Sequence, residues 1–329
     1  MIPASEYYGE YYGHTVEHLK AAVSALRAAG HKRFVWLVGD STLDNKHWLF
    51  DQGGGPSSMN DARSCAPALN GYERVLTPPR MVRDVCYWIN KSLHDARQER
   101  SGAGEPEPPM LCCVNTAVEE STLGERSGAA GRLTAQDEFV SEVISEGDVL
   151  IVNAGGNDVA LKPTKATAVY MALLLYLSCT CVIRSFSCAI ELCCGCHIGF
   201  PLGLSHFVRM FKTDTKEFIE KLVRRKKPRK VIVCMLYYLD ESPAGGWADG
   251  VLKMLGYDSN PAKLQAVIKR IFELSTTRIR IEGTEVIPFP LFEVLDGKNA
   301  NDYVQRVEPS VEGGRKMAEA LTPFIISEL

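Results

Sequence analysis

The chain has 329 residues, enough for one large α/β domain or two smaller ones. Hydrophobic residues make up 46% and charged residues 23%, which is typical of a protein with a real core, and a net charge of −3 argues against a general nucleic-acid binder. The polar, aromatic N-terminus lacks the apolar core of a signal peptide, so the eleven cysteines are expected to be reduced thiols in a cytoplasmic protein.

Residues 1–30 are expected to form an N-terminal extension that ends in a helix over 15–29. The run 34–38 (FVWLV) is continuously apolar, which is typical of a short strand buried on both faces. Gly39 permits a tight turn, and Ser41 then lies where a parallel strand passes into a loop, the usual place for chemistry in such a sheet. The alternative is an ordinary turn in which Asp40 or Ser41 only caps a helix.

Strands and helices are expected to alternate along the rest of the chain. This alternation predicts a parallel sheet covered by helices on both sides, in one domain over 1–329. A Rossmann domain is disfavoured because no G-x-G-x-x-G follows the first strand. Further strands are expected at 110–114, 149–152, 231–237 and around 285–288, helices at 80–95, 133–146, 216–225, 261–281 and 311–328, and loops at 51–79 and 98–109.

The segment 168–207 is apolar and rich in cysteine. Its apolar run over 168–183 is short for a membrane span, and Arg184 ends it, so no transmembrane anchor is expected. A buried helix covering the sheet is favoured, and a lid or acyl-chain surface beside the active site is the alternative. Paired Cys-x-x-Cys knuckles are missing, so buried thiols are favoured over a zinc site. The cysteines are Cys179, Cys181, Cys188, Cys193, Cys194 and Cys196.

Polar groups follow several of the predicted strands. Ser41 follows the first, the stretch 115–122 follows the second, and Asn157 follows the third, while 302–310 precedes the last helix. Because the carboxyl ends of neighbouring parallel strands meet at one edge of a sheet, these groups are expected to share one cleft.

Gly39-Asp40-Ser41, followed by Gly155-Gly156-Asn157-Asp158, resembles the SGNH, or GDSL, hydrolase family, and the resemblance extends from Phe34 to the C-terminus. It implies a three-layer, flavodoxin-like α/β/α fold with a five-stranded parallel sheet. It also implies a serine esterase, lipase or acyl-hydrolase without cofactor or metal, with Ser41 as nucleophile and Asn157 as a donor in the oxyanion hole. The expected substrate is a small ester or lipid-like molecule, and peripheral membrane contact is compatible with it.

Two blocks depart from the family pattern. Glu120 stands where the family has a glycine of the oxyanion hole, and a carboxylate there opposes a developing negative charge. Glu308 stands where the catalytic histidine belongs, and Gln305 where its orienting aspartate belongs; Asp302 lies three residues earlier. A glutamate with a reference pKa of about 4.3 is a weak base unless burial raises its pKa.

Two hypotheses remain open. In the first, the chain is an esterase in which Ser41 attacks, Asn157 and nearby backbone N–H groups hold the oxyanion, and Glu308 acts as an unusual base; His47 and His206 are substitute bases. In the second, it is an inactive relative that binds a ligand or a partner protein. The absent histidine discriminates between them.

Overall fold

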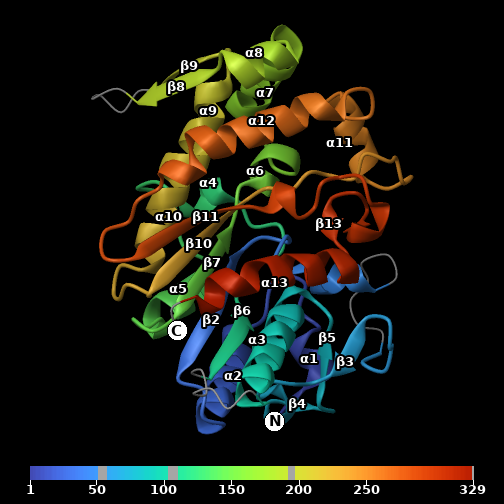
Figure 1. The fold of residues 1–329 in the computed structure, drawn as a ribbon, viewed down its shortest axis with the longest axis vertical. Helices are drawn as coiled ribbons and strands as arrows, with labels where there is room; N and C mark the ends of the chain where they lie inside the picture. Colours follow the sequence, from blue (N-terminus) through green and yellow to red (C-terminus); the bar gives the residue numbers. More distant parts are fainter. Residues whose placement is uncertain (51–57, 103–109, 192–196, 328–329) are drawn as a thin grey trace.

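The computed structural model describes residues 1–50, 58–102, 110–191 and 197–327. The five predicted strands form one parallel sheet in the order β11-β10-β7-β2-β6. This confirms the predicted fold class (Figure 1). The strands are β2 (Arg33–Gly39), β6 (Leu111–Asn115), β7 (Val149–Asn153), β10 (Lys230–Met235) and β11 (Glu285–Pro290).

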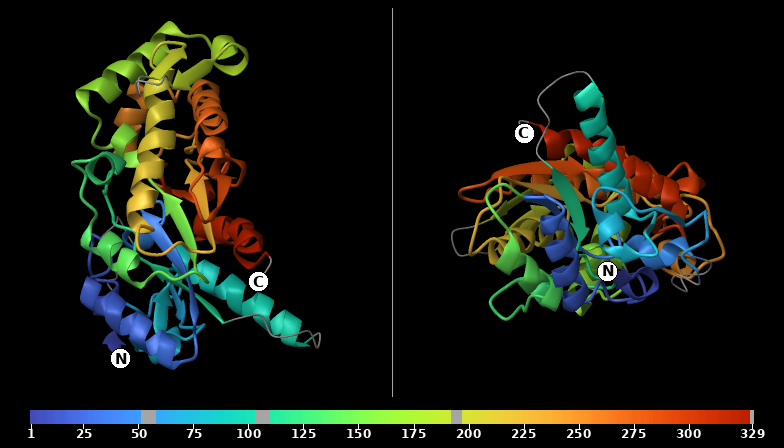
Figure 2. Two further views of the ribbon diagram at one scale, coloured as in Figure 1. Left: turned by 90° about the vertical axis from the view of Figure 1, so that its left-hand side faces the viewer. Right: turned by 90° about the horizontal axis from the view of Figure 1, so that it is seen from below.

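Each face of the sheet has its own hydrophobic core, because successive side chains of a strand point to opposite faces. Val35 and Leu37 of β2 pack with α3 (Val85–Gly102) and α13 (Val311–Ile326). Their neighbours Phe34 and Trp36 pack on the other face. That face is covered by α2 (Val16–Ala28), α5 (Ala135–Val143) and α10 (Thr215–Leu222). The two helical layers lie on opposite sides of the sheet in Figure 2.

The bounds predicted for the helix over 80–95 were wrong at both ends. Arg80–Val82 is a strand, β5, paired antiparallel with β3 (Cys65–Pro67). The helix begins at Val85 because the Asp84 carboxylate accepts the Tyr87 N–H at 2.7 Å, as an N-cap does. It continues to Gly102, into the stretch expected to be a loop.

The expected loop over 51–79 also contains β4 (Leu76–Thr77), which pairs with β1 (Ile2–Pro3). Within the expected loops, residues 51–57 and 103–109 lie outside the described residues. Further helices are α1 (Ala4–Tyr7), α4 (Leu123–Arg126), α6 (Gly156–Ala160), α9 (Leu204–Arg209), α11 (Ala248–Met254) and α12 (Pro261–Leu274), and two short strands are β12 (Tyr303–Val304) and β13 (Glu308–Pro309).

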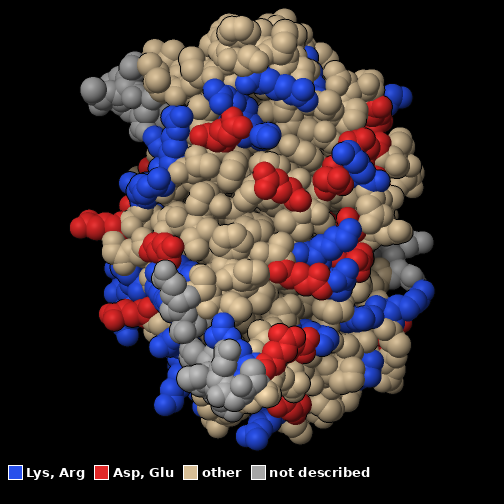
Figure 3. All heavy atoms as spheres, in the orientation of Figure 1, with Lys and Arg blue, Asp and Glu red and all other residues tan. Residues whose placement is uncertain are grey.

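A cap stands at one end of the molecule, at the top of Figure 1. It consists of α7 (Lys165–Leu177), α8 (Thr180–Ser185), β8 (Cys188–Glu191) and β9 (His197–Phe200). The prediction of one buried helix covering the sheet was wrong, because the helix breaks after Leu177 and exposes apolar side chains. Tyr176, Leu177 and Phe186 are 67%, 71% and 72% exposed. Figure 3 shows few charged side chains at this end.

The cysteines of the cap also differ from expectation. Cys179 and Cys181 form a disulfide, so the prediction of reduced thiols was wrong for this pair. Cys188 is free and exposed, whereas Cys193, Cys194 and Cys196 lie outside the described residues. The described ranges contain no group of three or more side chains suited to a metal ion. They also contain no helix with the length and hydropathy needed to cross a membrane.

Candidate active site

The turn after β2 fits tightly against the end of β7. Gly39 has a φ of 152°, and a Cβ atom there would stand 1.8 Å from the Asn153 carbonyl oxygen, so only glycine fits. The Asp40 N–H donates to the same carbonyl at 3.2 Å. The Asp40 carboxylate accepts the Thr42 N–H at 3.1 Å. These contacts hold Ser41 at the carboxyl edge of the central strands.

The last block brings Glu308 to this serine. Glu308 lies in β13, which pairs antiparallel with β12, and the Asn45 side chain donates to the Pro309 carbonyl at 2.9 Å. The Ser41 Oγ–H donates to Glu308 Oε1 at 3.0 Å. This distance lies within the range in which a side chain can take a proton from a serine.

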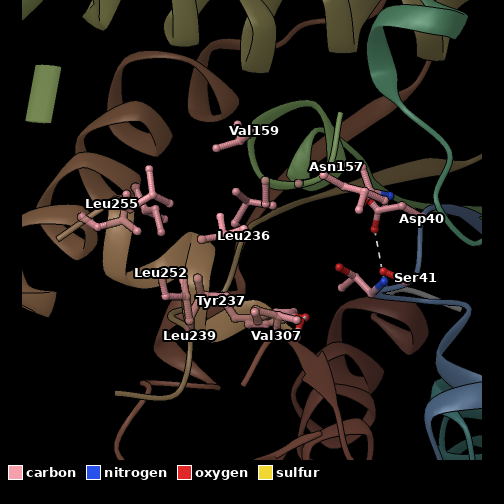
Figure 4. Close-up of a pocket in the computed structure, with 18 of the residues that line it drawn as sticks. Asp40, Ser41, Asn157, Val159, Leu236, Tyr237, Leu239, Leu252, Leu255 and Val307 are labelled. Atoms are coloured by element: carbon pink, nitrogen blue, oxygen red, sulfur yellow. Dashed lines mark hydrogen bonds between the residues drawn. The ribbon is translucent and has the colours of Figure 1, made fainter. Parts of the chain in front are cut away.

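Asn157 lines the same cavity as Ser41 and Glu308 (Figure 4). It lies in α6, whose N-cap Gly155 has a left-handed φ of 108°. Its Nδ2 donates one hydrogen bond, of 3.0 Å, to the Ser121 carbonyl, and an amide nitrogen carries a second hydrogen. Within the described residues, the Ser41 N–H donates to no acceptor. Both groups are hydrogen-bond donors of the kind that an oxyanion hole uses.

Most of this cavity is apolar. Helices α11 and α12 supply much of its wall, with further side chains from α7, α9 and the segment after β10. Such a surface suits a hydrocarbon chain better than a sugar or a phosphate. Members of this wall are Met171, Phe207, Phe211, Leu236, Tyr237, Leu239, Val251, Leu252, Leu255, Leu264, Val267, Ile268 and Ile271.

Other candidates from the sequence are not brought to Ser41. Asp302 accepts from Lys316 at 2.8 Å and from Asn299 at 3.1 Å. His47 Nε2 is bonded to the Glu10 carbonyl, and His206 Nε2 to the Thr167 hydroxyl. Among the described side chains, neither histidine bonds to Ser41.

The structure also shows the surroundings of Gln305 and Glu120, two residues that depart from the pattern of the resemblance. Gln305 Oε1 and Glu308 Oε2 are each buried without a hydrogen-bond partner in the described residues, so no hydrogen bond from Gln305 reaches this oxygen. Glu120 has a φ of 57°, in the left-handed region, at the position where the resemblance implies a glycine. Its carboxylate lies 3.5 Å from Lys162 Nζ and accepts from Tyr11 at 3.4 Å. Lys162 therefore offsets its negative charge.

The electrostatics of the site are dominated by buried acids. Burial raises the pKa of Glu308 well above its usual range, and the charge of Glu119 raises it further, while the Ser41 hydrogen bond lowers it. Burial also raises the pKa of Glu119 to about 8 and the pKa values of Asp40 and Asp44 to about 6 each. The buried Lys46 bonds to Asp44 at 2.6 Å.

Sequence reasoning missed Glu119, which is 3% exposed and lies beside Glu308 in space. It stands next to Glu120 in the block after the second strand. Nothing in the sequence indicates which of these two adjacent carboxylates faces inward.

No family model matches the sequence, and a search of curated proteins finds no match. Among solved structures, the chain is similar to an extracellular lipase from Streptomyces rimosus, with 13% identity, a TM-score of 0.42, and coverage of 90% of this chain and 100% of the lipase. It is also similar to Est24, a carbohydrate acetylesterase from Sinorhizobium meliloti, with 12% identity, a TM-score of 0.45, and coverage of 91% and 100%. An acetylxylan esterase from Geobacillus stearothermophilus has 14% identity, a TM-score of 0.41, and coverage of 91% and 96%. At these values nothing about this chain's chemistry follows from the likeness.

Proposed function

We propose that the protein is a serine esterase that cleaves esters of apolar acids. The observation that carries this proposal is the 3.0 Å hydrogen bond from Ser41 Oγ to Glu308 Oε1 at the wall of an apolar cavity. Asn157 and the Ser41 N–H supply donors for the oxyanion, and no cofactor takes part in the proposed steps.

The proposed reaction proceeds in two halves. Ser41 Oγ attacks the ester carbonyl carbon, and its proton passes to the Glu308 carboxylate. The ester C–O bond then breaks, and the leaving alcohol oxygen takes that proton from Glu308. In the second half, water attacks the acyl-serine, gives a proton to Glu308, and releases the acid while Ser41 Oγ recovers the proton.

A lipid-like substrate is supported by the cap as well as by the cavity. Met171 of α7 lines the cavity, and the outer face of the same cap exposes apolar side chains such as Phe186 and Phe200. We propose that this face makes peripheral contact with lipid. Co-sedimentation with phospholipid vesicles tests the contact, and equal sedimentation of the Phe186→Asp/Phe200→Asp variant contradicts it.

One observation favours a second candidate, a non-catalytic relative that binds a ligand or a partner protein. Burial and the charge of Glu119 raise the pKa of Glu308, which extends its protonated form to higher pH, and a protonated carboxyl cannot accept the serine proton.

A serine-reactive fluorophosphonate probe separates the two candidates, because labelling requires an activated serine. The esterase proposal predicts labelling that increases with pH and disappears in Ser41→Ala. Ser259→Ala is the matched control, since Ser259 is exposed, its Oγ donates to the Gly256 carbonyl, and it lines neither the apolar cavity nor the surroundings of Glu119. Absence of labelling across pH 6 to 10 in folded protein contradicts the esterase proposal and favours the binding protein.

A further inference from the structure

A second hollow meets the apolar cavity at Asn157 and Glu308. It is lined by three aromatic side chains, Tyr11, Trp48 and Trp247, and by the Glu119 carboxylate. In the proposed function the apolar cavity takes the acyl part of the ester. This hollow lies on the other side of Glu308, where the alcohol part would extend.

The indole rings of Trp48 and Trp247 lie next to each other. Their ring centroids lie 6.5 Å apart with the planes tilted by 34°, too close to enclose a group between the ring faces. Trp247 is 45% exposed, so the hollow opens at the surface. An aromatic face attracts cations through its quadrupole, most strongly in the case of tryptophan.

Two buried carboxylates in this hollow each have an unused oxygen. Glu119 is 3% exposed and Glu308 is 5% exposed. Glu119 Oε1 accepts from Trp48 Nε1 at 3.2 Å, and Glu308 Oε1 accepts from Ser41. In the described ranges, the Oε2 atoms of both residues have no hydrogen-bond partner. Leaving a buried polar atom unpaired is costly, so both oxygens are available to a ligand group that enters the hollow.

No basic side chain of the described residues forms an ion pair with these two carboxyl groups. Lys46 bonds to Asp44, and Lys162 lies against Glu120. Across the described part of the chain, no lysine, arginine or histidine forms an ion pair with Glu119 or Glu308 within 4.0 Å. A neutral polyol would supply only hydrogen bonds to these oxygens, whereas a cation would also lower the pKa values that burial has raised.

We propose that this hollow is a subsite for an organic cation, an ammonium or quaternary ammonium group carried by the alcohol part of the ester. The inference rests on the proposed function for its orientation, because the leaving alcohol oxygen must lie beside Glu308 to receive its proton. The acyl chain then occupies the apolar cavity.

A bound cation would also change the pKa of Glu308, the proposed base. A positive charge beside a carboxylate favours its ionised form, so the pKa values of Glu119 and Glu308 would fall. A cationic substrate would therefore help to create the base that cleaves it. Other titratable or charged groups also surround Glu119 and Glu308. They are Asp40, Asp44, Lys46, His47, Tyr11, His14, Tyr237, Glu120 and Lys162.

The test compares two esters of equal shape, decanoylcholine and 3,3-dimethylbutyl decanoate, in which carbon replaces the charged nitrogen. The full chain should cleave the choline ester with a kcat/KM at least about tenfold higher. In Glu119→Gln, which keeps the acceptor for Trp48 but removes the charge, the ratio should fall to within about threefold of unity. Glu138→Gln, a partner of Arg224 on α5, is the matched control and should keep the ratio. Equal rates for the two esters in the unmodified protein overturn the inference.

A binding measurement keeps this test separate from the proposed catalysis. Calorimetry on the Ser41→Ala protein should show binding of choline, with protons released, and at least about tenfold weaker binding of 3,3-dimethylbutan-1-ol. If neither ester is cleaved yet choline binds with this preference, the esterase proposal fails and the subsite stands. If both esters are cleaved but choline and its neutral analogue bind equally, the subsite fails and the esterase stands.

Discussion

The apolar cavity and the aromatic, acidic hollow meet at Glu308, but they are built differently. Much of the apolar wall comes from α12, where Leu264, Val267, Ile268 and Ile271 recur at the spacing of one helix face. The hollow is assembled from Tyr11 near the N-terminus, a tryptophan after β2, a glutamate after β6 and a tryptophan before α11. The helical periodicity of one segment therefore accounts for much of the apolar wall, whereas the hollow forms only when the tertiary fold brings four distant segments together. Four predictions separate their roles.

The largest effect is expected at Glu308, where the two regions meet. Glu308→Gln should lower kcat/KM for decanoyl esters at least about hundredfold, because the amide keeps the shape but cannot accept the serine proton. Glu308→His should retain or raise activity, because an imidazole is a base with a pKa near neutral pH. Steady-state kinetics measures both. Glu312→Gln, which loses only a surface pair with Arg315, is the control. Full activity in Glu308→Gln would remove the proposed base.

The second prediction concerns pH. Burial and the neighbouring carboxylate raise the pKa of Glu308, so the ionised base becomes available only as pH rises. For a neutral ester, kcat/KM should climb about tenfold per pH unit below that pKa and then level off. Glu119→Gln removes a repelling negative charge, so the midpoint should move to lower pH. A flat profile from pH 5 to 9, or an upward move of the midpoint in Glu119→Gln, would contradict this assignment.

The third prediction concerns a variant that narrows the apolar cavity and leaves the hollow unchanged. Val251→Phe places a larger side chain in the wall from α11 and should lower the ratio of kcat/KM for decanoyl over acetyl esters about tenfold, since several methylene groups lose their place. The preference for a choline over a neutral alcohol should be unaffected. A series of p-nitrophenyl esters of increasing chain length measures the ratio. Lys253→Ala, at an exposed position of the same helix, serves as the control.

The smallest effect is expected from Trp48. Trp48→Leu removes one aromatic face and the donor to Glu119, and should reduce the preference for decanoylcholine over its neutral isostere about threefold. The chain-length preference should remain, because Trp48 does not line the apolar cavity. The same pair of esters measures it. A loss of chain-length preference equal to the loss of choline preference would show that the two regions are not independent.

The sequence by itself determined the sheet and the position of Ser41. Five apolar runs and their helical separators are local patterns, and parallel strands place the Gly39–Ser41 turn and Asn157 at one edge by geometry. The resemblance also identified Glu308 as the residue at the histidine position, and the Ser41 hydrogen bond follows from that placement.

Only the tertiary structure decided the surroundings of Glu308. Burial of Glu119 beside it, the pairing of Glu120 with Lys162 and the diversion of Asp302 to Lys316 depend on contacts between segments far apart in the chain. The prediction of a buried helix in the cap was wrong for the same reason. Its hydropathy predicted burial, but a helix is buried only where another element covers it, and no described element covers Tyr176 or Leu177.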